Sequence, residues 1–257
     1  MDLAEIIYKQ TEVGLIPKDW TVNSLNTLLN ENPKYGVGAS AVDFDYNLPT
    51  YLRITDIDED GKLLPSGLKS VNHPESHNYF LKEGDVVLAR TGASVGKSYK
   101  YDSVDGQLVF AGFLIKVSPN PSKLDSQYLK CFLNTTSYWN WVTVNSMRSG
   151  QPGINGNEYG SLPIPLPPTI TEQKAIATAL SDVDSLISSL DKLITKKKAI
   201  KQGAMQLLLT PPHRGGKRLP GFKGDCTYDP NIDFASITAG ASVTQARIKE
   251  GIYNYKD

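Results

Sequence analysis

The sequence predicts an α+β fold in which a β-rich domain with small helices is followed by one long helix that forms a coiled coil. Residues 35–117 contain short apolar segments separated by Gly, Pro and Asn, which is typical of strands joined by turns. In residues 169–209, apolar side chains recur every three or four positions, as they do in a helix that pairs with another helix. These two patterns place the long helix after the β-rich region.

Composition and charge are those of an ordinary globular protein. The 257 residues are 40% hydrophobic, enough to bury a core, and their formal net charge is zero. No run of eighteen apolar residues occurs and residues 1–5 lack the basic start of a signal peptide, so we expect a cytoplasmic protein without a membrane segment. Residues 1–160 hold 14 Lys and Arg against 18 Asp and Glu, while residues 161–257 hold 13 against 9. A nucleic-acid contact by the first part would therefore need a local basic patch.

The β-rich region begins after a short N-terminal arm. Residues 14–20 are predicted to form a turn anchored by Trp20, and Asn23 or Ser24 is placed to cap a short helix that runs to Leu29. Candidate strands occupy residues 51–54, 85–90, 97–101 and 108–117. The second of these is a continuous apolar run, which predicts burial on both faces of a sheet.

A helical segment and a loop follow the strands. Asp125 or Ser126 is predicted to cap a helix whose apolar side chains pack in the core. Residues 146–157 then form a Gly- and Pro-rich loop, and loops of this length are usually functional or mobile. The expected division of the chain is a first domain at residues 1–160, a stiff proline-rich connector at 161–168, the long helix at 169–210 and a tail of unknown structure at 211–257.

The long helix is predicted to begin at Thr169, which with Glu172 makes the capping-box pattern. Its roughly forty residues span about 60 Å at about 1.5 Å per residue, more than a compact domain needs. Six apolar residues define a seam for pairing with a second helix: Ile176, Leu180, Val183, Ile187, Leu190 and Ile194. Lysines at 196–198 interrupt this seam, and Pro211 and Pro212 are expected to end the helix.

Residue spacing disfavours several kinds of catalytic and metal site. Cys131 and Cys226 lie far apart without a CxxC pair, which argues against a zinc cluster. His73 and His77 have the spacing of helical ligands, but a proline between them breaks a helix. The acidic run at residues 56–60 is predicted to be a solvated turn. No Ser-His-Asp order and no paired carboxylates in an acid–base context occur, so we expect a binding protein rather than an enzyme.

Residues 92–98 resemble a phosphate-binding loop but depart from it in two ways. Three residues separate Gly92 and Gly96 where the Walker A pattern needs four, and the residues that follow alternate like a strand instead of opening a helix. A nucleotide site is therefore disfavoured. The two glycines instead let backbone amides approach a DNA phosphate or base edge, with polar donors alongside. A plain hairpin turn is the competing interpretation.

Residues 32–35 resemble the Asn-Pro-Pro-aromatic signature with which adenine methyltransferases hold a flipped base. The third residue is Lys34 rather than proline, and no Gly-rich cofactor loop follows an early strand. The sequence thus argues against a methyltransferase active site in this chain.

Six motifs occur in a defined order along the chain. They are residues 16–20 (IPKDW), 84–92 (GDVVLARTG), 96–97 (GK), 149–154 (SGQPGI), 163–168 (PIPLPP) and 172–174 (EQK). In that order they resemble the specificity (S) subunit of type I restriction-modification systems. The resemblance covers about residues 12–222, and the proline segment, Glu-Gln and long helix after a Gly-Gln-Pro loop make the combination specific.

The resemblance implies a target recognition domain that reads one half of a bipartite double-stranded DNA sequence, followed by a helix that spaces it from a second such domain. It also implies a subunit without a catalytic centre or cofactor of its own. Its partners would be the methyltransferase (M) subunit, which uses S-adenosylmethionine, and the ATP-dependent restriction (R) subunit. This chain carries one half, and residues 217–222 resemble the entry into a second half that does not follow.

DNA contacts are expected from two loops. The candidate residues are Thr91, Gly92, Ser94, Gly96, Lys97, Ser98 and Tyr99 in one loop, and Arg148, Ser149, Gln151 and Asn155 in the other. Arg and Gln make bidentate contacts with base edges, whereas Ser, Thr and Lys more often hold phosphate.

A single half needs a second helix from another copy, which predicts a homodimer through the seam. We favour antiparallel pairing, because it would set a fixed spacer between the two halves of an inverted repeat. A hypothesis from another class is a truncated regulatory half-subunit that binds M subunits without sequence-specific DNA binding, and the near-neutral first domain supports it. A third class is an enzyme such as a nuclease or NTPase, which DNA turnover by this chain alone would indicate.

Overall fold

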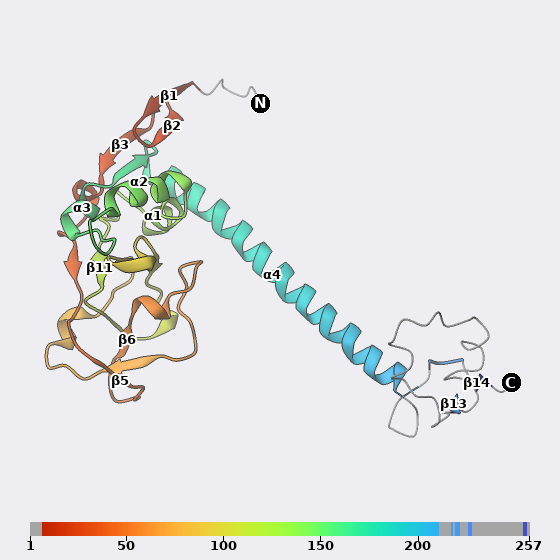
Figure 1. Cartoon of the computed structure of the whole chain (residues 1–257). Helices are drawn as coiled ribbons and strands as arrows, with labels where there is room; N and C mark the ends of the chain where they lie inside the picture. Colours follow the sequence, from red (N-terminus) through yellow and green to blue (C-terminus); the bar gives the residue numbers. More distant parts are fainter. Residues whose placement is uncertain (1–6, 211–216, 218, 222–225, 228–253, 256–257) are drawn as a thin grey trace. The chain divides into compact units, whose positions relative to one another are not determined.

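A computed structural model describes residues 7–210, 217, 219–221, 226–227 and 254–255 (Figure 1). The chain divides into two compact units, residues 1–182 and 183–257. The predicted tail at 211–257, including Pro211, Pro212 and most of the 217–222 motif, lies largely outside the described residues. Within the described part of that tail, β13 (Cys226–Thr227) pairs antiparallel with β14 (Asn254–Tyr255).

The N-terminal arm is a hairpin followed by a strand. β1 (Tyr8–Thr11) and β2 (Gly14–Pro17) pair antiparallel, and Gly14 supplies the positive φ of +106° that the turn between them requires. β3 (Thr21–Ser24) follows and leads into a 3-10 helix, η1 (Leu25–Leu28). Ser24 occupies the predicted N-cap position, but its side chain makes no capping hydrogen bond.

A four-stranded antiparallel sheet forms the centre of the first unit. Its strand order is β4 (Lys34–Tyr35), β11 (Leu114–Val117), β8 (Val86–Ala89) and β9 (Ser98–Lys100). Every residue of β8 is buried. Val86 and Leu88 face the core cluster that contains the helices, while Val87 and Ala89 face a second cluster on the other side of the sheet. The continuous apolar run is thus a strand covered on both faces, as predicted.

A second four-stranded sheet has the order β10 (Leu108–Phe110), β6 (Thr50–Leu52), β7 (Lys69–Val71) and β5 (Ala41–Asp43). β10 runs parallel to β6, and the other neighbours are antiparallel. The predicted strand at residues 108–117 is therefore two strands that belong to different sheets. Short 3-10 helices connect the strands: η2 (Ile54–Asp56), η3 (Ser76–Tyr79), η4 (Gly92–Ser94) and η5 (Ser103–Asp105).

The acidic run at residues 56–60 was predicted to be a solvated turn, but its first residue, Asp56, is buried. Asp56 is 3% exposed, and its Oδ2 accepts hydrogen bonds from the backbone N of Arg53 at 2.8 Å and from the Arg53 Nε at 2.9 Å. This capping box ends the predicted strand 51–54 at Leu52. Glu59 and Asp60 are exposed, as expected of a turn.

Three helices pack together against the central sheet: α1 (Ser126–Phe132), α2 (Thr136–Ser146) and α3 (Gly156–Gly160) (Figure 1). The Asp125 carboxylate accepts hydrogen bonds from the first-turn amides of α1, which confirms Asp125 as the predicted cap. Tyr128, Leu129 and Phe132 of α1 are buried in the same core cluster as Tyr138 of α2. The aromatic residues of this segment therefore serve the core.

The segment predicted to be a stiff proline-rich connector at 161–168 contains a strand of the first unit. β12 (Pro163–Leu166) pairs antiparallel with β3, and Ile164 and Leu166 are buried in the core. Prolines are tolerated here because the sheet has only two strands, so the missing N–H groups of Pro163 and Pro165 leave the ladder intact. The predicted boundary at residue 160 consequently lies inside a compact unit that extends to Asp182.

The predicted long helix is present as α4 (Ile170–Leu209), 40 residues in length. Thr169 Oγ1 accepts a hydrogen bond from the Glu172 amide at 3.1 Å, whereas the Glu172 carboxylate accepts one from Trp20 Nε1 at 3.3 Å. Half of the predicted capping box is thus replaced by a contact with the N-terminal arm. Among the described residues, no helix is long and apolar enough to cross a membrane.

Candidate nucleic-acid interface

The two predicted loops lie side by side and share backbone hydrogen bonds. Thr91 and Gly153 form an antiparallel bridge, and the Gly92 amide donates to the Pro152 carbonyl at 3.0 Å. Gly92 has a φ of +76°, and a Cβ at this position would stand 3.0 Å from Gln151 Nε2. Segments about sixty residues apart in the sequence therefore form one surface, and the positive φ of Gly92 is a backbone conformation that favours glycine.

Three of the predicted DNA-contact residues of the first loop, Gly96, Ser98 and Tyr99, are buried. A residue that contacts DNA has to be exposed. Tyr138 donates its hydroxyl proton to the Gly96 carbonyl at 2.7 Å. Tyr99 is 2% exposed and donates to Asp105 at 2.6 Å, and burial raises the pKa of the Tyr99 phenol above its ordinary value. Ser98 is also buried. Gly96, Ser98 and Tyr99 therefore have structural roles in the loop. The candidates that remain accessible in the first loop are Thr91, Gly92, Ser94 and, in part, Lys97.

Lys97 is paired with a carboxylate. Its Nζ lies 2.6 Å from Glu59 Oε1, and its side chain is 20% exposed against 88% for Glu59. The acidic segment that carries Glu59 is fixed by Lys130, whose Nζ donates to the carbonyls of Asp60 and Gly61. Burial lowers the pKa of Lys130. The positive charge of the first loop is thus balanced by an exposed carboxylate that the fold holds in place.

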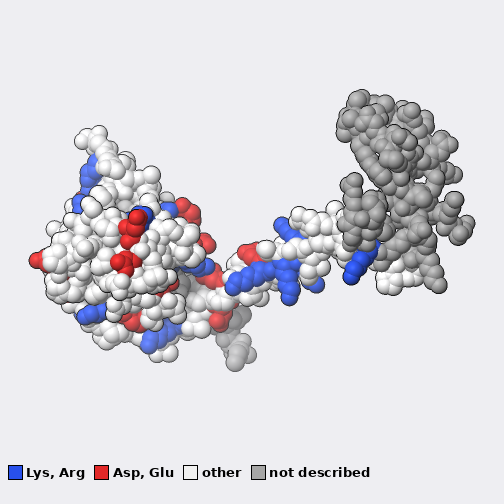
Figure 2. Space-filling model, turned by 90° about the horizontal axis from the view of Figure 1, so that it is seen from below, with Lys and Arg blue, Asp and Glu red and all other residues white. Residues whose placement is uncertain are grey.

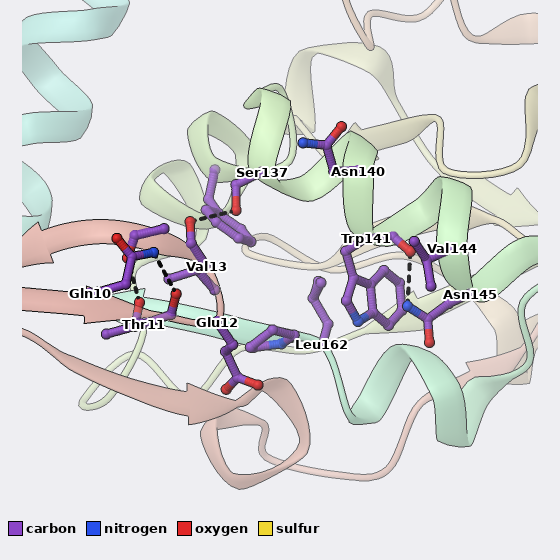
Figure 3. Close-up of a pocket in the computed structure, with 13 residues that line it drawn as sticks. Gln10, Thr11, Glu12, Val13, Ser137, Asn140, Trp141, Val144, Asn145 and Leu162 are labelled. Atoms are coloured by element: carbon purple, nitrogen blue, oxygen red, sulfur yellow. Dashed lines mark hydrogen bonds between the residues drawn. The ribbon is translucent and has the colours of Figure 1, made fainter.

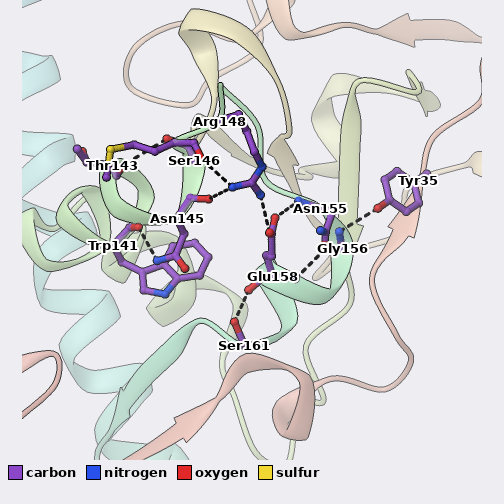
Figure 4. Close-up of polar contacts among 11 residues, drawn as sticks. Tyr35, Trp141, Thr143, Asn145, Ser146, Arg148, Asn155, Gly156, Glu158 and Ser161 are labelled. Carbon is purple, nitrogen blue, oxygen red and sulfur yellow. Dashed lines mark hydrogen bonds and ion pairs between the residues drawn. The ribbon is translucent and has the colours of Figure 1, made fainter. Parts of the chain in front are cut away.

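The second loop divides into structural and uncommitted side chains (Figure 4). Arg148 forms an ion pair with Glu158 and also donates to backbone carbonyls. Asn155 caps α3, and Glu158 completes this capping box through the Asn155 amide. Ser149 and Gln151 are exposed and make no side-chain hydrogen bond within the part of the chain that the structure describes. Their polar groups are therefore available to a ligand.

Sequence reasoning missed a residue pair next to both loops. The guanidinium of Arg90, at the end of β8, lies over the ring of Tyr35 with Cζ 4.9 Å from the ring centroid. The Tyr35 hydroxyl accepts a hydrogen bond from the Gly156 amide at 3.0 Å (Figure 4). A signal was present in the sequence, because Arg90 directly follows a fully buried strand and precedes the glycine loop.

Positive and negative side chains are mixed on the face of the first unit that Figure 2 shows. Figure 2 shows Lys and Arg interspersed with Asp and Glu over the globular part of the face in view, whereas blue residues gather on α4. Ion pairs join Lys34 to Glu31 and Lys116 to both Glu31 and Asp85. These pairs agree with the expectation that any DNA contact by this unit is local.

A pocket of about 550 Å³ lies between the β1–β2 hairpin and α2 (Figure 3). Ser137 donates its hydroxyl to the Val13 carbonyl at 2.8 Å across it. The lining includes one carboxylate, Glu12, and no His, Cys, Asp, Lys or Arg. This differs from the paired titratable groups that acid–base catalysis uses. Among the described residues, no group of three or more His, Cys, Asp or Glu side chains is arranged to hold a metal ion.

The family model of the type I restriction modification DNA specificity domain matches residues 17–202, from the end of β2 far into α4. The chain belongs to this family. It is similar to the putative type I restriction enzyme MjaX specificity subunit of Methanocaldococcus jannaschii. The two are 30% identical over 207 residues, which cover 79% of this chain and 48% of the relative. The EcoBI specificity subunit of Escherichia coli is 22% identical over 220 residues, 82% of this chain and 45% of the relative.

Solved structures of type I systems also resemble this specificity-domain protein. The HsdS subunit from Thermoanaerobacter tengcongensis is 20% identical with a TM-score of 0.49, and the match covers 81% of this chain and 53% of HsdS. The S subunit from M. genitalium is 18% identical with a TM-score of 0.46, covering 74% of this chain and 46% of that subunit. The chain thus spans about half the length of the relatives that it matches.

Proposed function

We propose that this chain is the DNA sequence-recognition subunit of a type I restriction-modification system, which reads one half of a bipartite target and docks a methyltransferase subunit. The observation that carries the proposal is the joining of the two predicted loops into one surface, inside the region that the specificity-domain family model covers. Catalysis, S-adenosylmethionine and ATP belong to partner subunits in this proposal, and a restriction subunit is a further partner.

In this proposal, the candidate side chains of the two loops divide into those that read bases and those that hold phosphate. Gln151 has a free amide, and the amide of Gln matches the N6 and N7 atoms of adenine in the major groove. Thr91 and Ser94 offer hydroxyl donors of the kind that position a protein on phosphates, and Lys97 would add an ammonium donor on leaving its ion pair with Glu59. Arg148 and Asn155 keep their structural partners and border this surface.

The seam of α4 supports a homodimer in this proposal. Five of its six residues are roughly half exposed, from 47% for Leu180 to 54% for Val183. Ile176 packs instead against the core of the first unit, so the seam open to pairing begins at Leu180. Burying a large aliphatic side chain contributes about 1.5–3 kcal/mol. Two antiparallel copies would then place two recognition domains on an inverted repeat.

The test is selection of DNA from a random pool by the purified chain together with its methyltransferase subunit, followed by sequencing of the retained fragments. A split motif is expected from the wild-type complex. Gln151→Ala should relax one position in each half while the rest of the motif stays. A complex that retains DNA without any sequence preference would contradict the proposal and indicate the regulatory half-subunit instead.

A further inference from the structure

Arg90 is an arginine whose hydrogen-bonding capacity is largely unused. Its Nε is buried without a hydrogen-bond partner among the described residues. Its Nη1 reaches the Gly112 carbonyl at 3.5 Å, the outer limit of a hydrogen bond. Buried polar groups are usually paired, and an unpaired one is a reason to look for a function. The guanidinium therefore has donors to offer to a group that arrives with a ligand.

The other two arginines in the described part of the chain do not share this property. Arg53 is bound by the Asp56 carboxylate, and Arg148 is bound by the Glu158 carboxylate. Both pairs hold a local capping structure together. Arg90 has no carboxylate within ion-pair distance among the described residues. Its charge therefore does not stabilise the fold through an ion pair.

The guanidinium is held in a fixed plane by its surroundings. It stacks over Tyr35, and an aromatic face orients a planar guanidinium while leaving its N–H edge open. Tyr35 is fixed in turn by its pairing with Ile115 in the sheet and by the Gly156 amide at its hydroxyl. A donor fork that is oriented before binding loses little entropy when it forms two hydrogen bonds at once.

Arg90 is also attached to both loops of the candidate interface. Its carbonyl accepts a hydrogen bond from the Ile154 amide at 2.9 Å, and its amide donates to the Phe113 carbonyl at 3.1 Å. Thr91 follows it directly and bridges to Gly153. The guanidinium thus stands on the backbone frame that joins the two loops.

We propose that Arg90, stacked on Tyr35, reads a guanine of the DNA target through two parallel hydrogen bonds to its O6 and N7 atoms. This inference rests on the proposed function, because it names a specificity-determining residue of the same site. Guanine presents two acceptors side by side in the major groove, which match the guanidinium fork. A phosphate is the other acceptor that suits arginine. Phosphate binding draws on clustered free cations, whereas Lys97 and Arg148 of the adjoining loops are each paired with a carboxylate.

The experiment compares motifs selected from random DNA by complexes of the methyltransferase subunit with the wild-type chain, Arg90→Ala, Arg90→Lys and Lys82→Ala. Arg90→Ala should make one guanine position in each half-site degenerate, lowering its discrimination about tenfold or more, while the other positions persist. Arg90→Lys keeps the charge but loses the fork, so the same position should relax. Lys82→Ala removes an exposed charge that precedes β8 and should leave the motif unchanged.

Tyr35 variants test the role of the stack. Tyr35→Phe keeps the aromatic face and should preserve the guanine, whereas Tyr35→Leu should weaken its selection. The proposal is overturned if the wild-type motif contains no guanine, or if both Arg90 variants keep every position and only retain less DNA, which is the behaviour of a phosphate contact. A wild-type complex without any motif would instead refute the proposed function. Thermal unfolding of each variant shows that a lost position is not a lost fold.

Discussion

The Gln173 side chain of α4 accepts a hydrogen bond from the backbone amide of Asp125, with 2.9 Å between Oε1 and the amide nitrogen. Its Nε2 donates to the Lys123 carbonyl at 3.1 Å, and the side chain is 2% exposed. One amide group thus joins the first turn of α4 to the residues that precede and cap α1. The start of the long helix is thereby fixed within the first unit.

Replacing Gln173 should destabilise this junction. Gln173→Ala removes two partly buried hydrogen bonds, and a hydrogen bond of this kind contributes about 0.5–1.5 kcal/mol. We expect a lower thermal midpoint, measured by circular dichroism. Lys174→Ala is the matched control, since Lys174 is the exposed neighbour on the same turn. Equal midpoints for the two variants would show that the bridge contributes nothing.

Charged residues in the open seam of α4 should prevent dimer formation. Leu180→Glu combined with Ile187→Glu places carboxylates where the helices would meet, and a monomer is expected by multi-angle light scattering. Ser185→Glu introduces one carboxylate at an exposed position outside the seam and should leave the mass unchanged. Dimers that persist in the double variant would show that another surface mediates association.

Removing the carboxylate that pairs with Lys97 should strengthen DNA binding. Glu59→Gln leaves Lys97 as an uncompensated cation, so affinity should rise severalfold and the slope of log affinity against log salt should steepen by about one. Fluorescence anisotropy across a salt series measures both effects. In a Lys97→Met background, Glu59→Gln should not increase DNA affinity. An increase of equal size in that background would show that Glu59 does not act through Lys97.

Acid should remove the stabilisation that comes from Glu31. The hydrogen bond from Lys34, with help from Lys116, lowers the pKa of this carboxyl below its usual 4.5. A depressed folded-state pKa means that the contribution is complete above 4.5 and is lost as the pH falls through the folded value. The wild type should exceed Glu31→Gln in stability by less than about 1 kcal/mol at neutral pH.

Urea unfolding at a series of pH values tests this linkage. The difference between the wild type and Glu31→Gln should shrink as the solution becomes acidic. Glu75→Gln alters an exposed carboxylate without an ion pair among the described residues, so it should show no such trend. A gap for Glu31→Gln that stays constant with pH would rule out the ionised carboxylate as its source.

Features that depend on neighbours in the sequence were predictable. The continuous apolar run of β8, the Asp125 cap and the period of α4 each follow from residues within a few positions of one another. The same holds for the fold class, which the structure and the family match confirm. Local rules were enough for these elements because their hydrogen bonds and burial patterns repeat over short distances.

Features that depend on distant pairing were not predictable. The prolines at 163–168 favoured an extended segment, but nothing local showed that β3, about 140 residues earlier, would pair with it. The burial of Tyr99 likewise follows from its packing in the cluster shared with the second sheet, since strand alternation alone does not show that both faces of β9 are covered. Arg90 was assigned to a buried strand, and its stack on Tyr35 emerges only when β4 joins the sheet.

The pairing of β3 with β12 brings the two ends of residues 25–162 together. A replacement for this segment has to match the β3–β12 junction and two further contacts, the Gln173 hydrogen bonds to Asp125 and Lys123 and the Ser137 hydrogen bond to Val13. If the proposed DNA contacts lie in this segment, a segment that keeps these contacts would carry its own sequence preference, while the hairpin before β3 and the helix after β12 stay the same. Grafting a foreign segment between Ser24 and Pro163 is thus the natural way to redirect this protein to a new sequence.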